Sequence, residues 1–309
     1  MKKILAILLL LFGFSALRSE AKQTFIYNIV GSDTLRLDLY EASGVDKPSP
    51  ALIFAFGGGF VNGERDRSDY IGMFEFLAHN GISVVSIDYR TQLRHLTAAD
   101  TGSMSRMVDC LTDAITCAVS DFLSATGYVL SHAASWNIDP SLIFASGSSA
   151  GAITALQAEY MLCNTPGGIG GFPADFNFAG VISFAGAIFS EGELEWTRTP
   201  APMLLFHGDA DSNVPYTDAT INSDGLYGSG PISKSLADKG VKHWLHTFKG
   251  VDHAIAIRPI YRNRGEIFDF IRAVRNKELD DMRAVETVRT DGYKTTFTLQ
   301  DFINSNYKH

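Results

Sequence analysis

The sequence has few cysteines and no excess of positive charge. Three cysteines in 309 residues cannot form the disulfide framework on which small secreted scaffolds depend. The 26 lysines and arginines are outnumbered by 34 aspartates and glutamates, which gives a formal net charge of −8. Because a nucleic-acid backbone is bound by a basic surface, we expect no nucleic-acid partner.

Motifs for metals and cofactors are also missing. The sequence contains no H-E-x-x-H, no closely paired cysteines and no compact cluster of carboxylates. The glycine-rich segment 167–171 follows a predicted helix, whereas dinucleotide binding requires such a turn after a strand. The segment 228–235 has Ser233 where a phosphate-binding loop needs glycine. We therefore expect neither a metal nor a cofactor.

The first 21 residues have the pattern of a secretory signal peptide. Two lysines precede an apolar run at residues 4–12, and the segment ends in the small-x-small sequence of residues 19–21. Even when carried to Leu17 the run has only about 14 residues, against about 20 needed to cross a bilayer. No cysteine follows it to carry a lipid. We expect a secreted or periplasmic protein without a stable membrane anchor.

The three cysteines leave one structural question open. Cys110 and Cys117 lie in one predicted helix, about 10.5 Å apart along its axis, so they cannot bridge each other. Either of them could pair with Cys163 in the next predicted helix. One such disulfide and buried free thiols are both compatible with the sequence.

The pattern of apolar residues predicts an α/β fold. Residues 23–29 and 34–42 are rich in β-branched and aromatic residues and predict an antiparallel hairpin. Later strands are expected to be apolar on both faces, as in a covered parallel sheet, at residues 51–56, 83–89, 142–146, 181–185 and 203–206, and a further strand is expected at residues 244–248. Helices are predicted between and after them at residues 70–80, 104–136, 150–161, 232–239 and 261–275. This alternation predicts a mostly parallel central sheet with helices on both faces.

The chain has no internal repeat and no linker rich in proline or serine. We therefore expect one domain at residues 22–276, after a signal peptide at residues 1–21. Residues 277–309 are more polar and are expected to form a C-terminal tail packed on or beside the domain. The sequence does not indicate an oligomeric state.

A candidate nucleophile lies where a predicted buried strand meets a predicted helix. Residues 147–151 read Gly-Ser-Ser-Ala-Gly and match the G-x-S-x-G nucleophile elbow in the context that this motif requires. Glycines two positions before and after the serine relieve crowding in the sharp turn, and Ser149, unlike Ser148, has both. The N-terminus of the following helix points its N–H groups at the same place.

A serine nucleophile needs a base and a carboxylate that orients the base. Asp209 and Asp211 follow the strand at 203–206, and His253 follows the strand at 244–248. Serine, acid and histidine, each beyond the carboxyl end of a strand, give the chain order of a hydrolase triad. His207 stands at a strand end, where we expect a structural role.

Three consecutive glycines, residues 57–59, follow the strand at 51–56. Without side chains, the backbone can approach a ligand closely, and its N–H groups can donate to a developing oxyanion.

With these four motifs, residues 23–276 resemble an α/β-hydrolase of the esterase/lipase branch, similar to secreted bacterial acetylxylan and feruloyl esterases and to the dienelactone-hydrolase-like group. The family pattern H-G-x-x-D-x-x-V-P implies that Asp211 is the triad acid, which leaves Asp209 a capping or solvated role. The resemblance also implies that the N–H groups of Gly58, Gly59 and Ala150 form the oxyanion hole. Phe56 departs from the family pattern, since it stands where a histidine braces this loop.

The resemblance implies a serine carboxylesterase in which Ser149, Asp211 and His253 perform two-step acyl transfer. The short segment between the strands near residues 185 and 202 leaves no room for a large lid domain, so we expect an open site. Together with export, this favours short acyl esters, on a small molecule or a polysaccharide, as the substrate.

Phe60, Tyr89 and Trp196 are candidate walls of the substrate pocket. Three alternatives remain: a lipase-like enzyme, a prolyl-oligopeptidase-like hydrolase, or a non-catalytic binding protein on the hydrolase scaffold. The second usually carries a large N-terminal domain, whereas only about 30 residues precede the first predicted parallel strand here. An intact triad speaks against the third.

Overall fold

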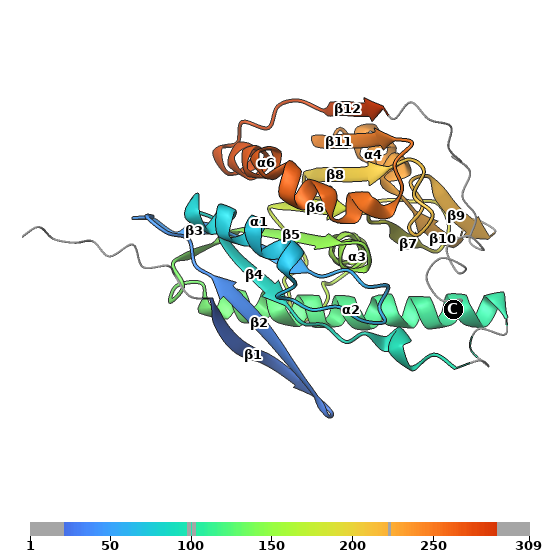
Figure 1. The fold of residues 1–309 in the computed structure, drawn as a ribbon, viewed down its shortest axis with the longest axis horizontal. Coiled ribbons are helices and arrows are strands. Elements are labelled where there is room, and N and C mark those ends of the chain that lie inside the picture. The colour runs from blue at the N-terminus through green and yellow to red at the C-terminus, as the bar shows by residue number, and fades with distance from the viewer. Residues whose placement is uncertain (1–21, 98–99, 101–102, 222–223, 289–309) are drawn as a thin grey trace, which may run out of the picture.

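A computed structural model describes residues 22–97, 100, 103–221 and 224–288. Nine strands form one sheet in the order β1-β2-β4-β3-β5-β6-β8-β11-β12 (Figure 1). The strands β1, β2 and β4 pair in antiparallel fashion, and all later neighbours are parallel. The strands are β1 Gln23–Val30, β2 Asp33–Tyr40, β3 Ser49–Ala55, β4 Ser83–Ile87, β5 Ile138–Ser148, β6 Gly180–Phe184, β8 Met203–Gly208, β11 His243–Lys249 and β12 Arg283–Val288.

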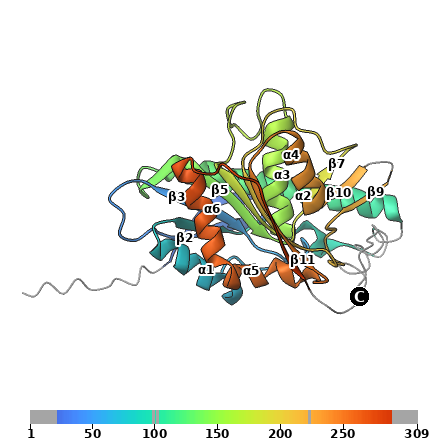
Figure 2. The same ribbon diagram turned by 90° about the horizontal axis from the view of Figure 1, so that it is seen from above.

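Helices cover both faces of this sheet (Figure 2). One face carries α1 Ser68–His79, α5 Arg258–Arg262 and α6 Arg264–Asn276, and the other carries α2 Met104–His132, α3 Ala150–Asn164 and α4 Ser229–Asp238. Two short 3₁₀ helices, η1 Gln92–His95 and η3 His253–Ala256, lie in loops. The predicted α/β architecture, with its antiparallel N-terminal hairpin, is confirmed.

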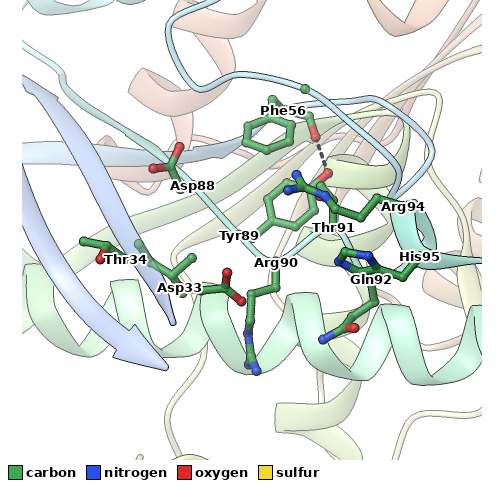
Figure 3. Close-up of a pocket in the computed structure, with 12 residues that line it drawn as sticks. Asp33, Thr34, Phe56, Asp88, Tyr89, Arg90, Thr91, Gln92, Arg94 and His95 are labelled. Atoms are coloured by element: carbon green, nitrogen blue, oxygen red, sulfur yellow. Dashed lines mark hydrogen bonds between the residues drawn. The ribbon is translucent and has the colours of Figure 1, made fainter. Parts of the chain in front are cut away.

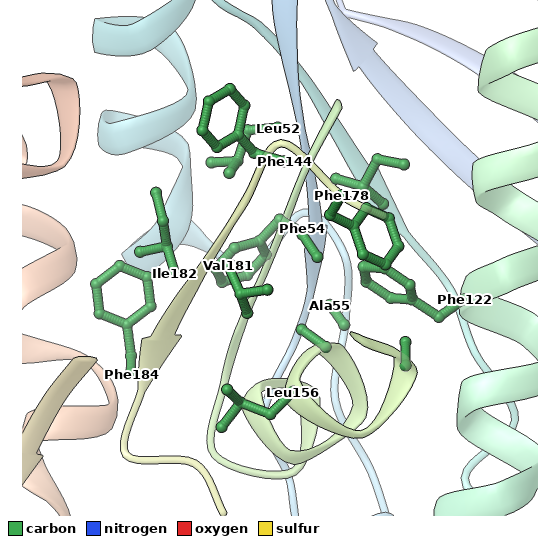
Figure 4. Close-up of a cluster of buried hydrophobic side chains, with 14 of the residues drawn as sticks. Leu52, Phe54, Ala55, Phe122, Phe144, Leu156, Phe178, Val181, Ile182 and Phe184 are labelled. Carbon is green, nitrogen blue, oxygen red and sulfur yellow. The ribbon is translucent and has the colours of Figure 1, made fainter. Parts of the chain in front are cut away.

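The core explains why these strands are apolar on both sides. Every residue of β3, β4, β6 and β8 is buried, because helices cover each face of the sheet. Figure 4 shows the centre of this core, where side chains from three neighbouring strands meet side chains of α2 and α3. The labelled residues include Leu52, Phe54, Phe122, Phe144, Leu156, Val181 and Phe184. A rigid core of this kind fixes the strand ends from which the candidate site is built.

The helix α2 is long and apolar enough to cross a membrane by length and composition, with a mean hydropathy of 1.2 in its most apolar stretch. However, 56% of that stretch is buried inside the protein. Residues such as Leu111, Ile115 and Phe122 pack into the core. This burial is typical of a core helix.

A second, smaller sheet lies beyond the main one. It contains β7 Ile188–Ser190, β10 Asp224–Tyr227 and β9 Asp218–Ile221, with β10 in the middle and antiparallel to both neighbours. Gln157 of α3 exchanges two hydrogen bonds with the backbone of Phe189, which fixes β7 against that helix. The loop after the candidate acid therefore contains a hairpin that pairs with the segment after β6.

The predicted C-terminal tail contributes a strand to the main sheet. The strand β12 pairs with β11 and extends the sheet into residues 283–288, which the sequence assigns to the tail. Residues 1–21, with the predicted signal peptide, lie outside the described residues.

All three cysteines are free thiols, so no disulfide joins Cys163 to Cys110 or Cys117. Burial raises the pKa of the Cys163 thiol, and Glu159 beside it adds to this effect.

Candidate active site

Ser149 sits in a strained turn between β5 and α3. Its backbone angles are φ 52° and ψ −120°, in a region that side chains rarely adopt. The turn can be this tight because its flanking residues lack a Cβ. A Cβ on Gly147 would overlap the carbonyl of Gly151, and a Cβ on Gly151 would overlap the carbonyl oxygens of Ala55 and Phe56. The elbow is therefore packed directly against the end of β3.

The three predicted triad side chains form one hydrogen-bonded chain. His253 Nε2 lies 2.7 Å from Ser149 Oγ, and His253 Nδ1 lies 2.7 Å from Asp211 Oδ2. They come from the turn after β5, the turn after β8 and the helix η3 after β11. Asp211 is buried, whereas the His253 side chain is 20% exposed. An orienting carboxylate, an imidazole and a hydroxyl in this order can activate the hydroxyl as a nucleophile.

Asp211 is held as a carboxylate by several donors. Its Oδ1 accepts hydrogen bonds from the backbone N–H groups of Asn213 and Val214, at 2.8 and 3.0 Å. Burial acts to raise the pKa of Asp211, but the charge of His253 and hydrogen bonds from His207 and His253 outweigh it. The pKa therefore lies well below its usual range, and the group is charged at neutral pH.

The sequence placed His207 in a structural role, and its contacts connect it to the candidate acid. The ring is fully buried, and its Nε2 lies 3.2 Å from the carbonyl oxygen of Val214 and 3.4 Å from Asp211 Oδ2. Since both partners are acceptors, Nε2 carries the proton. Nδ1 then accepts from the Ser229 hydroxyl at 2.8 Å.

Two further side chains hold the loop that carries His253. The Ser148 hydroxyl donates to the carbonyl of Ala256 at 2.8 Å. Asp209 accepts from the N–H of Gly250 at 2.6 Å, which is the capping role expected of it. No sequence motif marks the Ser148 bond, because its partner lies more than 100 residues away.

The glycine loop lies beside the elbow. A Cβ on Gly57 would stand 3.1 Å from the Cβ of Ser149. Gly58, at φ 140°, accepts hydrogen bonds from Val61 and Asn62 and starts a tight turn in which a Cβ would overlap Asn62. Ala150 is the first residue of α3, where N–H groups have no acceptor within the helix. The predicted oxyanion donors thus come from two segments that converge on Ser149.

The predicted pocket residues Phe60, Tyr89 and Trp196 are all buried, at 1%, 4% and 2% exposure. Tyr89 lines one cleft and Trp196 another, and no residue of the predicted triad borders either of these two clefts. Tyr89 donates its hydroxyl hydrogen to the carbonyl of Phe56, and Trp196 donates its indole N–H to Ser235.

Among the described residues, no group of three metal-binding side chains is placed to hold an ion.

The chain is similar to a known protein family and to several named enzymes. The family model BD-FAE matches residues 37–166. The chain is 24% identical over 285 residues to the isoprenylcysteine alpha-carbonyl methylesterase ICME of Arabidopsis thaliana, which covers 80% of this chain and 60% of that protein. It is 32% identical over 123 residues to a probable enzyme of the same name from Oryza sativa subsp. japonica, covering 40% of this chain and 25% of that protein. The chain thus spans at most about 60% of the length of these relatives.

Solved structures of an esterase from Thermogutta terrifontis have the same fold. Its native form superposes with a TM-score of 0.59 at 20% identity, covering 84% of this chain and 94% of that chain. Its propionate-bound form gives a TM-score of 0.60 at 22% identity, covering 84% and 96%. The solved structures thus show that the chain has the fold of these esterases, and the curated relatives to which it is similar are named as esterases.

Proposed function

We propose that the protein is a serine carboxylesterase in which Ser149, His253 and Asp211 perform the chemistry. The observation that carries the proposal is the continuous chain of two 2.7 Å contacts from Asp211 through His253 to Ser149. The converging glycine loop and α3 N-terminus support it, since an acyl-transfer site needs both a nucleophile and an oxyanion hole.

The reaction proceeds in two halves. Ser149 Oγ attacks the ester carbonyl carbon while its proton passes to His253 Nε2, and Asp211 stabilises the resulting imidazolium. The N–H groups of Gly58, Gly59 and Ala150 donate to the oxyanion. When the tetrahedral intermediate collapses, His253 protonates the departing alcohol and an acyl-enzyme remains. Water then attacks the acyl group with His253 as base, which releases the carboxylic acid and restores Ser149.

The substrate we propose is a short acyl ester on a small alcohol or a polysaccharide. It is supported by the similar Thermogutta terrifontis esterase, which has been solved with propionate and with butyrate bound. A second candidate is a methyl ester of a larger acid, because the matched relatives are methylesterases. In the first case the small group is the acyl part, and in the second it is the alcohol.

Covalent labelling tests the nucleophile. Incubation of the wild type with a fluorophosphonate should attach one label per chain, and Ser149→Ala should take up none. The matched control is Ser141→Ala, which removes an exposed hydroxyl of β5, the strand before Ser149. Among the described residues this hydroxyl donates only to Asp139, so the variant should be labelled like the wild type. An unlabelled wild type would refute the enzyme function and favour a binding protein. Paraoxon, which phosphorylates the Thermogutta terrifontis esterase, is a second reagent for this test.

An ester panel tests the substrate. We expect kcat/KM for nitrophenyl acetate to exceed that for nitrophenyl octanoate, and acetylated oligosaccharides to be hydrolysed. Preference for octanoate would favour a lipase-like enzyme. Cleavage of arylamides without a preference for esters would favour a peptidase. Release of methanol from methyl esters, with acetyl esters left intact, would favour the second candidate.

We also propose that residues 1–21 direct export, on the basis of their composition. Mass spectrometry of the protein recovered from the periplasm or medium should give a chain that begins at Lys22. Recovery of the intact chain from the cytoplasm alone would contradict this proposal.

A further inference from the structure

The glycine loop needs external support if its N–H groups are to serve as an oxyanion hole. Glycines lose more conformational freedom on ordering than other residues, and donors must stand within about 2.7–3.1 Å of the oxyanion to act on it. In the family pattern a histidine at position 56 braces this loop, and here the residue is Phe56. The structure contains a different set of contacts at the same place.

Tyr89 holds the loop from the side of β4. Its hydroxyl donates to the carbonyl oxygen of Phe56 at 2.8 Å, as the dashed line in Figure 3 shows. The two rings stack with centroids 4.4 Å apart and an interplanar angle of 24°. Both side chains are buried, so this bond is shielded from water. They form one wall of a cleft of about 210 Å³ behind the loop.

Tyr70 holds the loop from the side of α1. The N–H of Gly57, the residue after Phe56, donates to the Tyr70 hydroxyl at 3.1 Å. The Tyr70 ring is fully buried and packs against Phe54 of β3, with centroids 4.8 Å apart. Two tyrosine hydroxyls therefore fix the C=O and the N–H of one peptide unit, from two different elements.

The far end of the loop is also fixed. Gly63 lies so close to the ring of Phe56 that a Cβ at this position would overlap that ring and the carbonyl of Gly57. Arg65 then places its Nη1 3.0 and 2.9 Å from the two carboxylate oxygens of Asp88, and its Nε 3.1 Å from Asp38. The loop is thus fixed at both ends. The peptide that the two tyrosines hold joins Phe56 to Gly57, and it directly precedes the predicted donors Gly58 and Gly59.

We propose that Tyr89 and Tyr70 are positioning residues of the oxyanion hole, which together replace the bracing histidine. This inference rests on the proposed function. The tyrosines do not touch the reacting atoms. They aim the N–H groups of Gly58 and Gly59 by fixing the peptide that precedes them, so their removal lowers transition-state binding more than substrate binding.

The test compares two tyrosine variants that each lose one hydroxyl bonded to a backbone carbonyl. Tyr89→Phe removes the bond to Phe56, and Tyr227→Phe removes a bond of the same kind, to the carbonyl of Gly192 in the smaller sheet region. The readouts are kcat and KM for nitrophenyl acetate, and the inhibition constant of a trifluoromethyl ketone, whose adduct with Ser149 places an oxyanion in the hole. Losing one oxyanion donor outright costs about 10²–10³ in kcat, so a loosened loop should cost less, about 10-fold.

We expect Tyr89→Phe to lower kcat about 10-fold at nearly constant KM and to weaken ketone inhibition by the same factor. Tyr227→Phe should change neither, although both variants lose thermal stability. Unchanged kcat in folded Tyr89→Phe would overturn the proposal, as would a lower kcat with unchanged ketone inhibition. If Tyr89→Phe does not fold, Tyr70→Phe carries the same test. A wild type that hydrolyses no ester would instead refute the proposed function, and this inference with it.

Discussion

His207 Nε2 lies 3.4 Å from Asp211 Oδ2, the oxygen that His253 Nδ1 contacts at 2.7 Å. The carboxylate of the proposed triad is therefore shared by two imidazoles, of which one is fully buried and the other borders the site. A second donor on this oxygen restricts the carboxylate to the orientation that His253 requires.

We predict that His207→Asn keeps the fold and lowers kcat/KM for nitrophenyl acetate about 10-fold, the effect of losing one hydrogen bond to a charged group. The asparagine cannot reach Asp211, so the carboxylate loses one donor and part of the stabilisation of its charge. The matched variant is His243→Asn, a buried histidine bonded to Ser233 and Val241. Equal losses in both variants would mean that His207 acts through general packing.

A second prediction concerns acid stability. The pKa of Asp211 is lower in the folded protein than its value of about 3.9 in an unfolded chain. The unfolded state therefore binds more protons in the acid range, and the stabilisation by this group is present above about pH 4 and is lost as pH falls toward the folded-state pKa.

Urea unfolding of wild type and Asp211→Asn between pH 7 and pH 3 measures this effect. We expect the wild type to be more stable by at least about 1 kcal/mol at pH 7, and the difference to shrink below about pH 4. A difference that stays constant over this range would show that Asp211 is not the titrating group.

A third prediction uses two glycines that both lie in helices. Gly151→Ala should abolish ester hydrolysis and destabilise the fold, because the added Cβ meets the carbonyls of Ala55 and Phe56 at the end of β3. Gly127→Ala in α2 should raise stability by about 0.5–1 kcal/mol, since nothing lies within 4 Å of its added Cβ. Thermal unfolding and turnover of nitrophenyl acetate report both effects. An active Gly151→Ala enzyme would contradict the packing of the elbow against β3.

A fourth prediction concerns Ser148→Ala. The variant leaves the nucleophile in place but frees the carbonyl of Ala256 from its 2.8 Å bond. We expect a loss of about 1–3 kcal/mol in the free energy of unfolding. Because η3 carries His253, we also expect a several-fold lower kcat. Ser124→Ala, whose hydroxyl donates to Ser120 in α2, is a control for loss of a serine hydroxyl and should keep full activity. A Ser148→Ala enzyme with wild-type kcat would mean that the remaining contacts suffice to hold His253.

The sequence predicted the parts of the molecule that depend on local pattern. Strand positions followed from runs that are apolar on both faces, and Ser149, Asp211 and His253 followed from motifs at the carboxyl ends of strands. The three residues lie within hydrogen-bond distance as a consequence of the parallel topology, which brings those ends to one edge.

Features that depend on contacts between distant segments of the chain could not be predicted from the sequence. The strands β7, β9 and β10 have three or four residues each, too few to show a periodic pattern, and β7 pairs with β10, which follows much later in the chain. Tyr89 was predicted to line the substrate pocket. It lines a cleft that no residue of the predicted triad borders, and its hydroxyl donates to a carbonyl that lies 33 residues earlier.

The loop that carries His253 is tied to the rest of the protein at three points before any substrate is present. Asp209 binds its start at Gly250, Asp211 binds the imidazole, and Ser148 binds Ala256 at the end of η3. A base held in this way needs no help from the substrate to reach its place. Binding energy from the substrate is then not consumed in assembling the site, so even very small esters with few contacts should be turned over efficiently.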